Sequence, residues 1–344
     1  MAIVNARVVA LLGERIATNV IKVAPDDQVT GILYHMSKGF RAACAVVRLA
    51  GARFKGARLL YASVDDRWGG LYTLFFVVLA RGFGLRIWLH HHSYRYIVQK
   101  SRIMKALTIS AGPGTTHIVL CEEMKAAFAG IYPAAKRFAI VPNAIDPPEP
   151  SPPTPKEGPL TIGLLANLTF EKGLAEFVDI IEKALAGGHN LRGILAGSAG
   201  VAEAKFIERS VQVLGGRLDW IGPVSGKAKE AFFASTDLFV FPTKSESFGL
   251  VLLEALVRGI PIIAPAHGCV CLFETLEAAV VVPLSDDFAT RALESIARLA
   301  FDPALLEQMR IVARVEGLTL NAAHESSLRA LVTTLVAEVE SSVA

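Results

Sequence analysis

Short apolar runs alternate with longer stretches of helical periodicity along most of the chain. Before residue 146, the runs that we expect to form strands are 19–24, 57–62, 86–90, 117–121 and 138–141. After residue 159, they are 160–166, 192–196, 218–221, 237–241, 261–265 and 279–282. Continuously apolar strands separated by helices are typical of parallel sheets covered on both faces. The pattern predicts an α/β fold with two doubly wound, Rossmann-like domains facing a cleft.

A proline-rich segment separates the two sets of strands. Residues 146–159 read DPPEPSPPTPKEGP, with seven prolines in fourteen residues. Proline fixes φ and has no backbone N–H, so such a segment forms neither a helix nor a central strand and is typical of a semi-rigid linker. We therefore expect a first domain over 1–146, a linker over 147–159 and a second domain over 160–344. The last helices, from about 300, are expected to pack back across the structure.

The hydrophobic content of 52% is high, but it is spread along the chain. The longest apolar run that could suggest a membrane-spanning segment is residues 71–80, with ten residues. It is too short to cross a bilayer and is better explained as a buried helix. The first apolar stretch is interrupted by Arg7, Glu14 and Arg15, so no secretory signal is expected. Four scattered cysteines suit a reducing compartment. These features predict a cytoplasmic protein.

The net charge of +3 hides a difference between the two halves. Residues 1–150 contain 19 Lys or Arg against 9 Asp or Glu, a net +10, and residues 151–344 contain 16 against 23, a net −7. A basic first half indicates an anionic partner, such as a lipid-phosphate acceptor or an acidic membrane surface. The alternative is an ordinary solvated surface. Nucleic acid is not expected, because no basic run is interleaved with aromatic residues.

The segment 245–265, SESFGLVLLEALVRGIPIIAP, carries the most chemistry. Glu246 lies in a loop just before a predicted helix, and Glu254 lies about two turns inside that helix. The start of a helix offers unpaired backbone N–H groups and a partial positive charge, which favour phosphate. One carboxylate is positioned for ribose hydroxyls and the other for a sugar beyond the phosphates. Such a segment has a place for each part of a nucleotide-sugar.

This segment resembles the donor-site signature of family 4-type retaining glycosyltransferases, which have the GT-B fold. Five further segments resemble the same family in order and spacing: VPNAID (141–146), LLANLTFEKG (164–173), LAGSAG (195–200), DWIGPV (219–224) and TDLFVFPT (236–243). The resemblance is specific over about 160–285 and moderate over 86–146. It implies transfer of a sugar from a nucleotide-diphosphate sugar to a glycan or lipid-linked acceptor, with retention of configuration.

The resemblance also implies roles for particular residues. Lys172 would stabilise the leaving phosphate, Glu246 would orient the donor sugar, and His91 would contact that sugar from the first domain. Glu254 would hold the ribose. The remaining donor-binding positions are Asn167, Gly222, Val224, Ser247, Phe248, Gly249 and Leu250. Asp-x-Asp, the usual metal-dependent nucleotide-sugar motif, is absent from the sequence, so we expect metal-independent catalysis without a cofactor.

Two features depart from the family pattern. The chain opens at residues 2–15 with a helical pattern, where family members usually have a strand and a glycine-rich turn, so we expect both to be missing from the first domain. Asn167 stands where the family usually has Arg. Arginine brings a permanent charge and a bidentate fork, whereas asparagine offers only a neutral hydrogen bond. Diphosphate stabilisation would then depend on Lys172 and the helix start.

Several of these positions can also be explained by structural roles that involve no ligand. Glu254 is also explained as a surface helix residue, and the run His90–His92 as a structural feature. A metal site there is not expected, because adjacent residues on a strand point to opposite sides. We choose His91 over His92 because it precedes Ser93 by two positions, which resembles the family pattern. The alternative functions are a degenerate GT-B protein that binds a nucleotide or a partner without transfer, and a GT-B sugar-nucleotide epimerase. A weak contact with the anionic inner face of a membrane is also expected.

Overall fold

The computed structural model describes residues 2–23, 31–148, 158–283, 285 and 287–341. It divides into two compact units, of which unit 1 comprises the residues up to Asn143 and those from Glu325 onward, and unit 2 comprises Ala144–His324. Each unit holds one sheet, and every strand pair within the sheets is parallel. The predicted α/β class with two parallel-sheet domains is confirmed.

Unit 1 has a four-stranded sheet in the order β1-β2-β3-β4. Its strands and helices, in chain order, are α1 (Ala2–Gly13), α2 (Gly31–Phe54), β1 (Leu59–Val64), α3 (Gly69–Gly82), β2 (Arg86–His91), α4 (Arg95–Val98), α5 (Arg102–Ala111), β3 (Thr116–Val119), α6 (Glu122–Ile131) and β4 (Arg137–Ile140). The helix expected over 71–80 is α3, but it is buried on one side only, since Leu71, Phe75 and Val78 are exposed. The opening helical pattern is α1. In the part of the chain that the structure describes, β1 follows two helices.

The strand predicted at 19–24 is wrong. Residues 19–23 have no regular structure, and residue 24 lies outside the described residues. Arg48 of α2 donates from its guanidinium to the side-chain oxygen of Asn19 at 3.1 Å and to the backbone oxygen of Val20 at 2.9 Å. The backbone carbonyl of Val20 therefore bonds to a helix side chain and not to a neighbouring strand.

Unit 2 has a six-stranded sheet in the order β10-β9-β8-β5-β6-β7. Its elements are β5 (Leu160–Leu165), η1 (Phe170–Lys172), α7 (Leu174–Ala186), β6 (Leu191–Ala196), α8 (Val201–Leu214), η2 (Gly215–Arg217), β7 (Leu218–Trp220), α9 (Gly226–Ser235), β8 (Leu238–Val240), α10 (Leu250–Leu256), β9 (Ile262–Ala266), η3 (Gly268–Phe273), β10 (Ala279–Pro283) and α11 (Phe288–Phe301). All six strands predicted after the linker are present, with bounds shifted by a residue or two.

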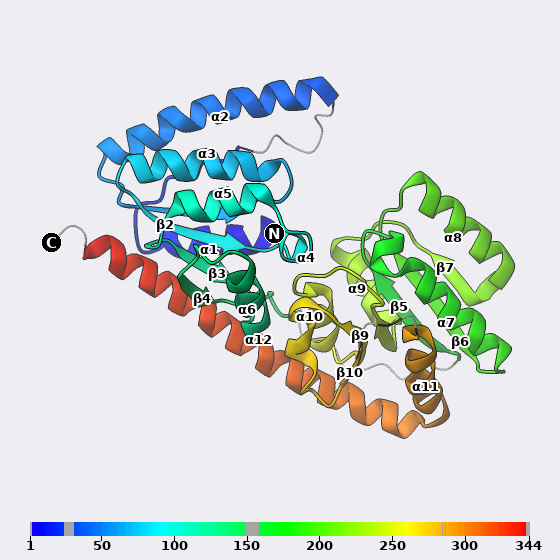
Figure 1. Ribbon diagram of the computed structural model, residues 1–344. Coiled ribbons are helices and arrows are strands. Elements are labelled where there is room, and N and C mark those ends of the chain that lie inside the picture. The colour runs from blue at the N-terminus through cyan, green and yellow to red at the C-terminus, as the bar shows by residue number, and fades with distance from the viewer. Residues whose placement is uncertain (1, 24–30, 149–157, 284, 286, 342–344) are drawn as a thin grey trace. The chain divides into compact units, whose positions relative to one another are not determined.

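The C-terminal helix α12 (Pro303–Glu340) belongs to both units along its length (Figure 1). From Glu325 onward it lies in unit 1, whereas the sequence assigned all of 160–344 to the second domain. The reason is apolar burial. Leu328, Leu331, Val332 and Leu335 join one buried cluster with Val8 and Leu12 of α1 and with Trp88 and Ile118 of the sheet. Burying such side chains stabilises this face of unit 1.

Four histidines of unit 1 are buried in the core around β2 and β3. His90 and His92 lie toward α1, because the Nδ1 of His90 is 2.6 Å from the hydroxyl of Tyr61 and the Nε2 of His92 is 3.2 Å from the side-chain oxygen of Asn5. His91 lies on the other side of the strand. Its Nδ1 is 2.9 Å from the hydroxyl of Tyr96, and its Nε2 is 2.9 Å from the Nδ1 of His117.

Burial lowers the pKa of each of these histidines. The pKa of His92 and that of His117 fall to about 4, and those of His90 and His91 fall well below the ordinary value. Among the described residues, the Nε2 atoms of His90 and His117 and the Nδ1 of His92 have no hydrogen-bond partner. A proton added to any of these nitrogens would leave a buried charge unpaired, which is costly. The folded unit therefore keeps the four rings neutral.

No described helix combines the length and the apolar character needed to cross a membrane.

We predict that acid destabilises unit 1 through these histidines. Their pKa in the unfolded chain is about 6.5, so below that value the unfolded state binds protons that the folded state excludes. Above pH 6.5 the histidines therefore do not lower the free energy of unfolding. As the pH falls from 6.5 toward 4, that free energy decreases by about 1.4 kcal/mol per pH unit for each histidine. Urea unfolding between pH 7.5 and 5, followed by the fluorescence of the tryptophans, measures the slope.

The variant His117→Asn should show a smaller loss of stability over this pH range than the unsubstituted protein. His189→Asn, in unit 2, is the control for removing a histidine elsewhere and should keep the original slope. An identical pH dependence in all three proteins would contradict the prediction.

Candidate functional site

The candidate site lies at the carboxyl ends of the central strands of unit 2. Strand β5 pairs with β6 on one side and with β8 on the other, so the order of the strands reverses at β5. In open parallel sheets, ligands bind beyond the carboxyl ends of the strands at such a reversal. Asn167 and Lys172 follow β5, Glu246 follows β8, and His267 follows β9. The sheet topology thus places residues that are up to a hundred positions apart in the sequence at the same edge of the sheet.

A tight loop after β5 holds Lys172. The hydroxyl of Thr169 accepts a hydrogen bond from the backbone N–H of Lys172 at 3.2 Å and so caps the short helix η1. Gly173 follows with φ +82°, and a Cβ at this position would come within 2.1 Å of the backbone oxygen of Pro242. Only glycine combines this left-handed backbone with such a close approach. The loop after β5 therefore packs directly on the chain that leaves β8.

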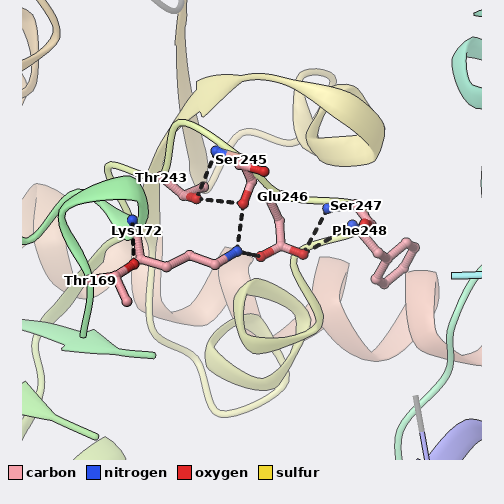
Figure 2. Close-up of polar contacts among 7 residues, drawn as sticks. All are labelled: Thr169, Lys172, Thr243, Ser245, Glu246, Ser247 and Phe248. Carbon is pink, nitrogen blue, oxygen red and sulfur yellow. Dashed lines mark hydrogen bonds and ion pairs between the residues drawn. The ribbon is translucent and has the colours of Figure 1, made fainter. Parts of the chain in front are cut away.

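Lys172 and Glu246 form an ion pair in which both side chains are partly buried. The Nζ of Lys172 is 2.9 Å from the Oε2 of Glu246 and also donates to the backbone oxygen of Ser245, as Figure 2 shows. The other oxygen of Glu246 accepts from the backbone N–H of Ser247 at 2.8 Å and of Phe248 at 3.3 Å. The exposed fractions of the two charged side chains are 28% and 21%. This geometry brings two predicted catalytic residues together.

The surroundings keep Glu246 ionised. Burial by itself would raise the pKa of its carboxyl, but the Lys172 ammonium and the two backbone N–H groups outweigh burial and hold the pKa below its usual value. His267 lies close enough to feel the same charges. Burial lowers the pKa of His267, Glu246 opposes that shift, and Lys172 adds to it. The site therefore combines a cation, an anion and an imidazole.

The predicted donor-binding residues after Glu246 form the turn into α10. Phe248 is buried, with its ring 6.3 Å from that of Phe273 and 5.6 Å from that of His324. Gly249 precedes the helix with φ +77°, a conformation that glycine adopts without strain. Leu250 is the first residue of α10, which has only seven residues. Two N–H groups of this turn, those of Ser247 and Phe248, are bonded to Glu246.

Glu254 lies on α10, as predicted, and pairs with a lysine that sequence reasoning did not identify. The Nζ of Lys229, on α9, is 2.7 Å from the Oε1 of Glu254. The next residue, Glu230, accepts two hydrogen bonds from Arg258, at 2.9 and 2.7 Å. These bonds join α9 to α10. Gly222, with φ +71°, and Val224 lie in the loop that leads from β7 into α9. These two predicted donor-binding positions therefore precede the helix that carries the lysine partner of Glu254.

Asn167 lies in an exposed position after β5. Its side-chain oxygen accepts from the hydroxyl of Ser198 at 3.0 Å, in the loop after β6. The amide is therefore held by the neighbouring strand end.

His91 belongs to unit 1 and lies in the buried network described above, with no exposed surface. Its predicted contact with the donor sugar stays a prediction. Within either unit, the described residues contain no group of three His, Cys, Asp or Glu side chains whose ligand atoms are close enough for one metal ion.

Sequence reasoning missed His267 and Lys229. A usable signal existed for His267, since it directly follows an apolar strand and precedes Gly268, which has φ +58°. No signal existed for Lys229, because its role depends on the packing of α9 against α10.

Comparison with known proteins agrees with this geometry. Residues 148–313 match the family described as glycosyl transferases group 1. An uncharacterized glycosyltransferase of Methanocaldococcus jannaschii is 30% identical over 106 residues, which are 30% of this chain and 26% of that protein. The gpi3 subunit of phosphatidylinositol N-acetylglucosaminyltransferase of Schizosaccharomyces pombe is 24% identical over 208 residues, 56% of this chain and 45% of that protein. The matches therefore span less than half the length of these relatives.

Among solved structures, HepE of Anabaena in complex with UDP has a TM-score of 0.68 at 16% identity. The match covers 91% of this chain and 84% of that one. At this identity the likeness concerns the fold. Residues 148–313, slightly less than half of the chain, are similar to the glycosyl transferases group 1 family, and the two units have the GT-B fold.

Proposed function

We propose that this chain transfers a hexose from a nucleoside-diphosphate sugar to a glycan or lipid-linked acceptor, with retention of configuration. The observation that carries the proposal is the Lys172–Glu246 pair at the carboxyl ends of β5 and β8. A diphosphate leaving group needs a cation, and a sugar needs a hydrogen-bond acceptor. The pair supplies both at the edge of the sheet where ligands of such folds bind.

The chemistry follows from charge. Breaking the bond between sugar and diphosphate leaves negative charge on the phosphate, and a positioned ammonium group stabilises that charge in the transition state. Lys172 would exchange Glu246 for the diphosphate when the donor binds. Glu246 would then accept from the sugar hydroxyls, and Ser247 and Phe248 would direct their N–H groups to the phosphates. No metal or cofactor is needed in this scheme.

Glu254 would hold the ribose in a similar exchange. Its carboxylate is now bonded to Lys229, and ribose hydroxyls would replace the lysine. Retention follows from attack by the acceptor on the face from which the phosphate leaves, with the phosphate taking the proton.

The acceptor and location are proposed on two grounds. The S. pombe relative is named for transfer of N-acetylglucosamine to phosphatidylinositol, and the first 150 residues of this chain carry a net charge of +10, from 19 basic and 9 acidic residues. We infer that the protein works in the cytoplasm, at the inner face of a membrane. The nucleotide of the donor is proposed to be a diphosphate such as UDP, which HepE binds.

The first test is substitution of the ion pair. Removing a charged hydrogen-bond partner costs about 1.5–3 kcal/mol, so Lys172→Gln should weaken nucleoside-diphosphate binding about ten- to hundred-fold by calorimetry. Glu246→Gln should keep most of that affinity and lose sugar hydrolysis or transfer, because its carboxylate is proposed to act on the sugar.

Lys183→Gln is the matched control, since Lys183 forms an exposed pair with Asp179 on α7 of the same unit. Failure of the unsubstituted protein to bind UDP, GDP or ADP at millimolar concentration would overturn the proposed function. Binding without hydrolysis or transfer would favour the degenerate, non-transferring alternative.

The second test concerns the ribose carboxylate. Glu254→Ala should weaken nucleotide binding about ten- to hundred-fold by loss of charged hydrogen bonds. Lys229→Met removes the competing partner and should leave the affinity equal to or higher than that of the unsubstituted protein. Unchanged affinity of Glu254→Ala would give Glu254 a purely structural role in joining α10 to α9.

The third test restores the family's residue at position 167. Asn167→Arg adds a permanent positive charge beside Lys172 and should tighten diphosphate binding. The alanine variant Asn167→Ala, which removes the bond to Ser198 without adding charge, separates the two effects. Weaker binding by the arginine variant would mean that another group already fills the space.

A further inference from the structure

Two neighbouring helices of unit 1, α2 and α3, expose large apolar side chains. On α2, Phe40, Val47 and Phe54 are 73%, 73% and 90% exposed. Trp68, which precedes α3, is 78% exposed, and Leu71, Phe75 and Val78 on α3 are 43–49% exposed. Soluble proteins rarely expose so many large apolar side chains in one region, and such patches mark interaction sites. These seven side chains are called the outer face below.

The outer face is a regular feature of both helices. The residues of α2 recur every seven positions, and those on and before α3 recur at intervals of three and four, which places each set along one side of its helix. The opposite sides, which carry Ala45 and Leu49 on α2 and Val77 and Ala80 on α3, are buried. Each helix is therefore apolar on its inner side and again on its outer side.

The charges within the helices around this surface have one sign, although Asp65 and Asp66 lie just before Trp68. The sequences of α2, α3 and the adjacent α5 contain no Asp or Glu. Among the residues whose side chains the structure describes, they contain six basic residues, namely Arg41, Arg48, Arg53, Arg81, Arg102 and Lys105. Figure 1 shows the three helices next to one another in unit 1. A cationic apolar surface is complementary to one that is anionic at its boundary and apolar beneath it.

A helix of unit 2 provides the contrast. Helix α8 also exposes apolar side chains, with Val201 at 79% and Val213 at 70%. It carries Glu203 and Glu208 together with Lys205 and Arg209. Mixed charge around single exposed valines is ordinary protein surface. The combination of an apolar stripe with a single sign of charge distinguishes α2 and α3.

We propose that the outer face of α2 and α3 docks on an anionic lipid bilayer. The aromatic and aliphatic side chains would enter the boundary between headgroups and acyl chains, and the arginines and lysines would remain among the lipid phosphates. Basic residues near an anionic surface are attracted to it, and salt screens this attraction. A second copy of this chain is a poorer occupant, because pairing two outer faces would bring like charges together.

The proposal rests on the membrane location proposed above and names the surface and the lipid. Its test requires no donor sugar, so its failure and that of sugar transfer are distinguishable. The full chain is sedimented with vesicles of phosphatidylcholine alone and with vesicles that also contain phosphatidylglycerol, each at low and high salt. Pelleting with the anionic vesicles at low salt is expected, with a blue shift of tryptophan fluorescence that Trp68→Phe diminishes.

Two sets of variants identify the surface. The double variant Val47→Asp, Phe75→Asp should lower the vesicle partition coefficient by at least about tenfold, since charges in this layer are costly. Val213→Asp on α8 is its control and should bind as the unsubstituted protein does. Arg102→Gln with Lys105→Gln should reduce binding to anionic vesicles and its salt dependence, and Lys205→Gln with Arg209→Gln should change neither.

Unfolding midpoints are measured for every variant. If the aspartate variant folds poorly, the variant Arg102→Gln with Lys105→Gln still tests vesicle binding by this surface. Equal recovery with neutral and anionic vesicles would overturn the proposal. So would undiminished binding by both test variants. Concentration-dependent self-association that the aspartate variant abolishes, without vesicle binding, would assign the outer face to a second copy and overturn it equally.

Discussion

The ion pair between Lys172 and Glu246 is the interaction on which the site of unit 2 depends. A partly buried carboxylate needs a cation or hydrogen-bond donors, since desolvation otherwise neutralises it. Glu246 has both, because Lys172 lies at 2.9 Å and two backbone N–H groups reach its other oxygen. The loops after β5 and β8 are thereby tied together. The lysine that we propose to bind a diphosphate is thus held in place by the carboxylate that we propose to bind the sugar.

That pair exists because of the sheet. The loop after β5 approaches the chain leaving β8 so closely that position 173 has no room for a Cβ. Parallel pairing places the two loops at the same edge, and the reversal of strand order at β5 places them side by side. The same packing brings α9 to α10 and gives Glu254 its lysine partner. Both predicted carboxylates are therefore held in ion pairs, and we propose that ligand binding exchanges their partners.

Unit 1 buries the polar rings of four histidines in its core. Its four histidines remain neutral, because burial lowers the pKa of each one. They bond to tyrosine hydroxyls, to Asn5 and to one another. The outer surface of the same unit has the opposite character, with apolar side chains exposed on α2 and α3.

The sequence by itself determined the α/β class, the parallel strands and the identity of most of the site. Those conclusions rest on local signals: apolar runs, the proline-rich segment and the ordered motifs around Lys172, Glu246 and Glu254. Tertiary structure decided what local patterns do not contain. Residues 19–23 of the first apolar run form no strand, and Arg48 bonds to the backbone oxygen of Val20. The end of α12 belongs to unit 1, because its leucines join one buried cluster with α1. Lys229 and His267 enter the site through packing between elements distant in sequence, and a pattern read along one segment carries no information about the segment that will face it.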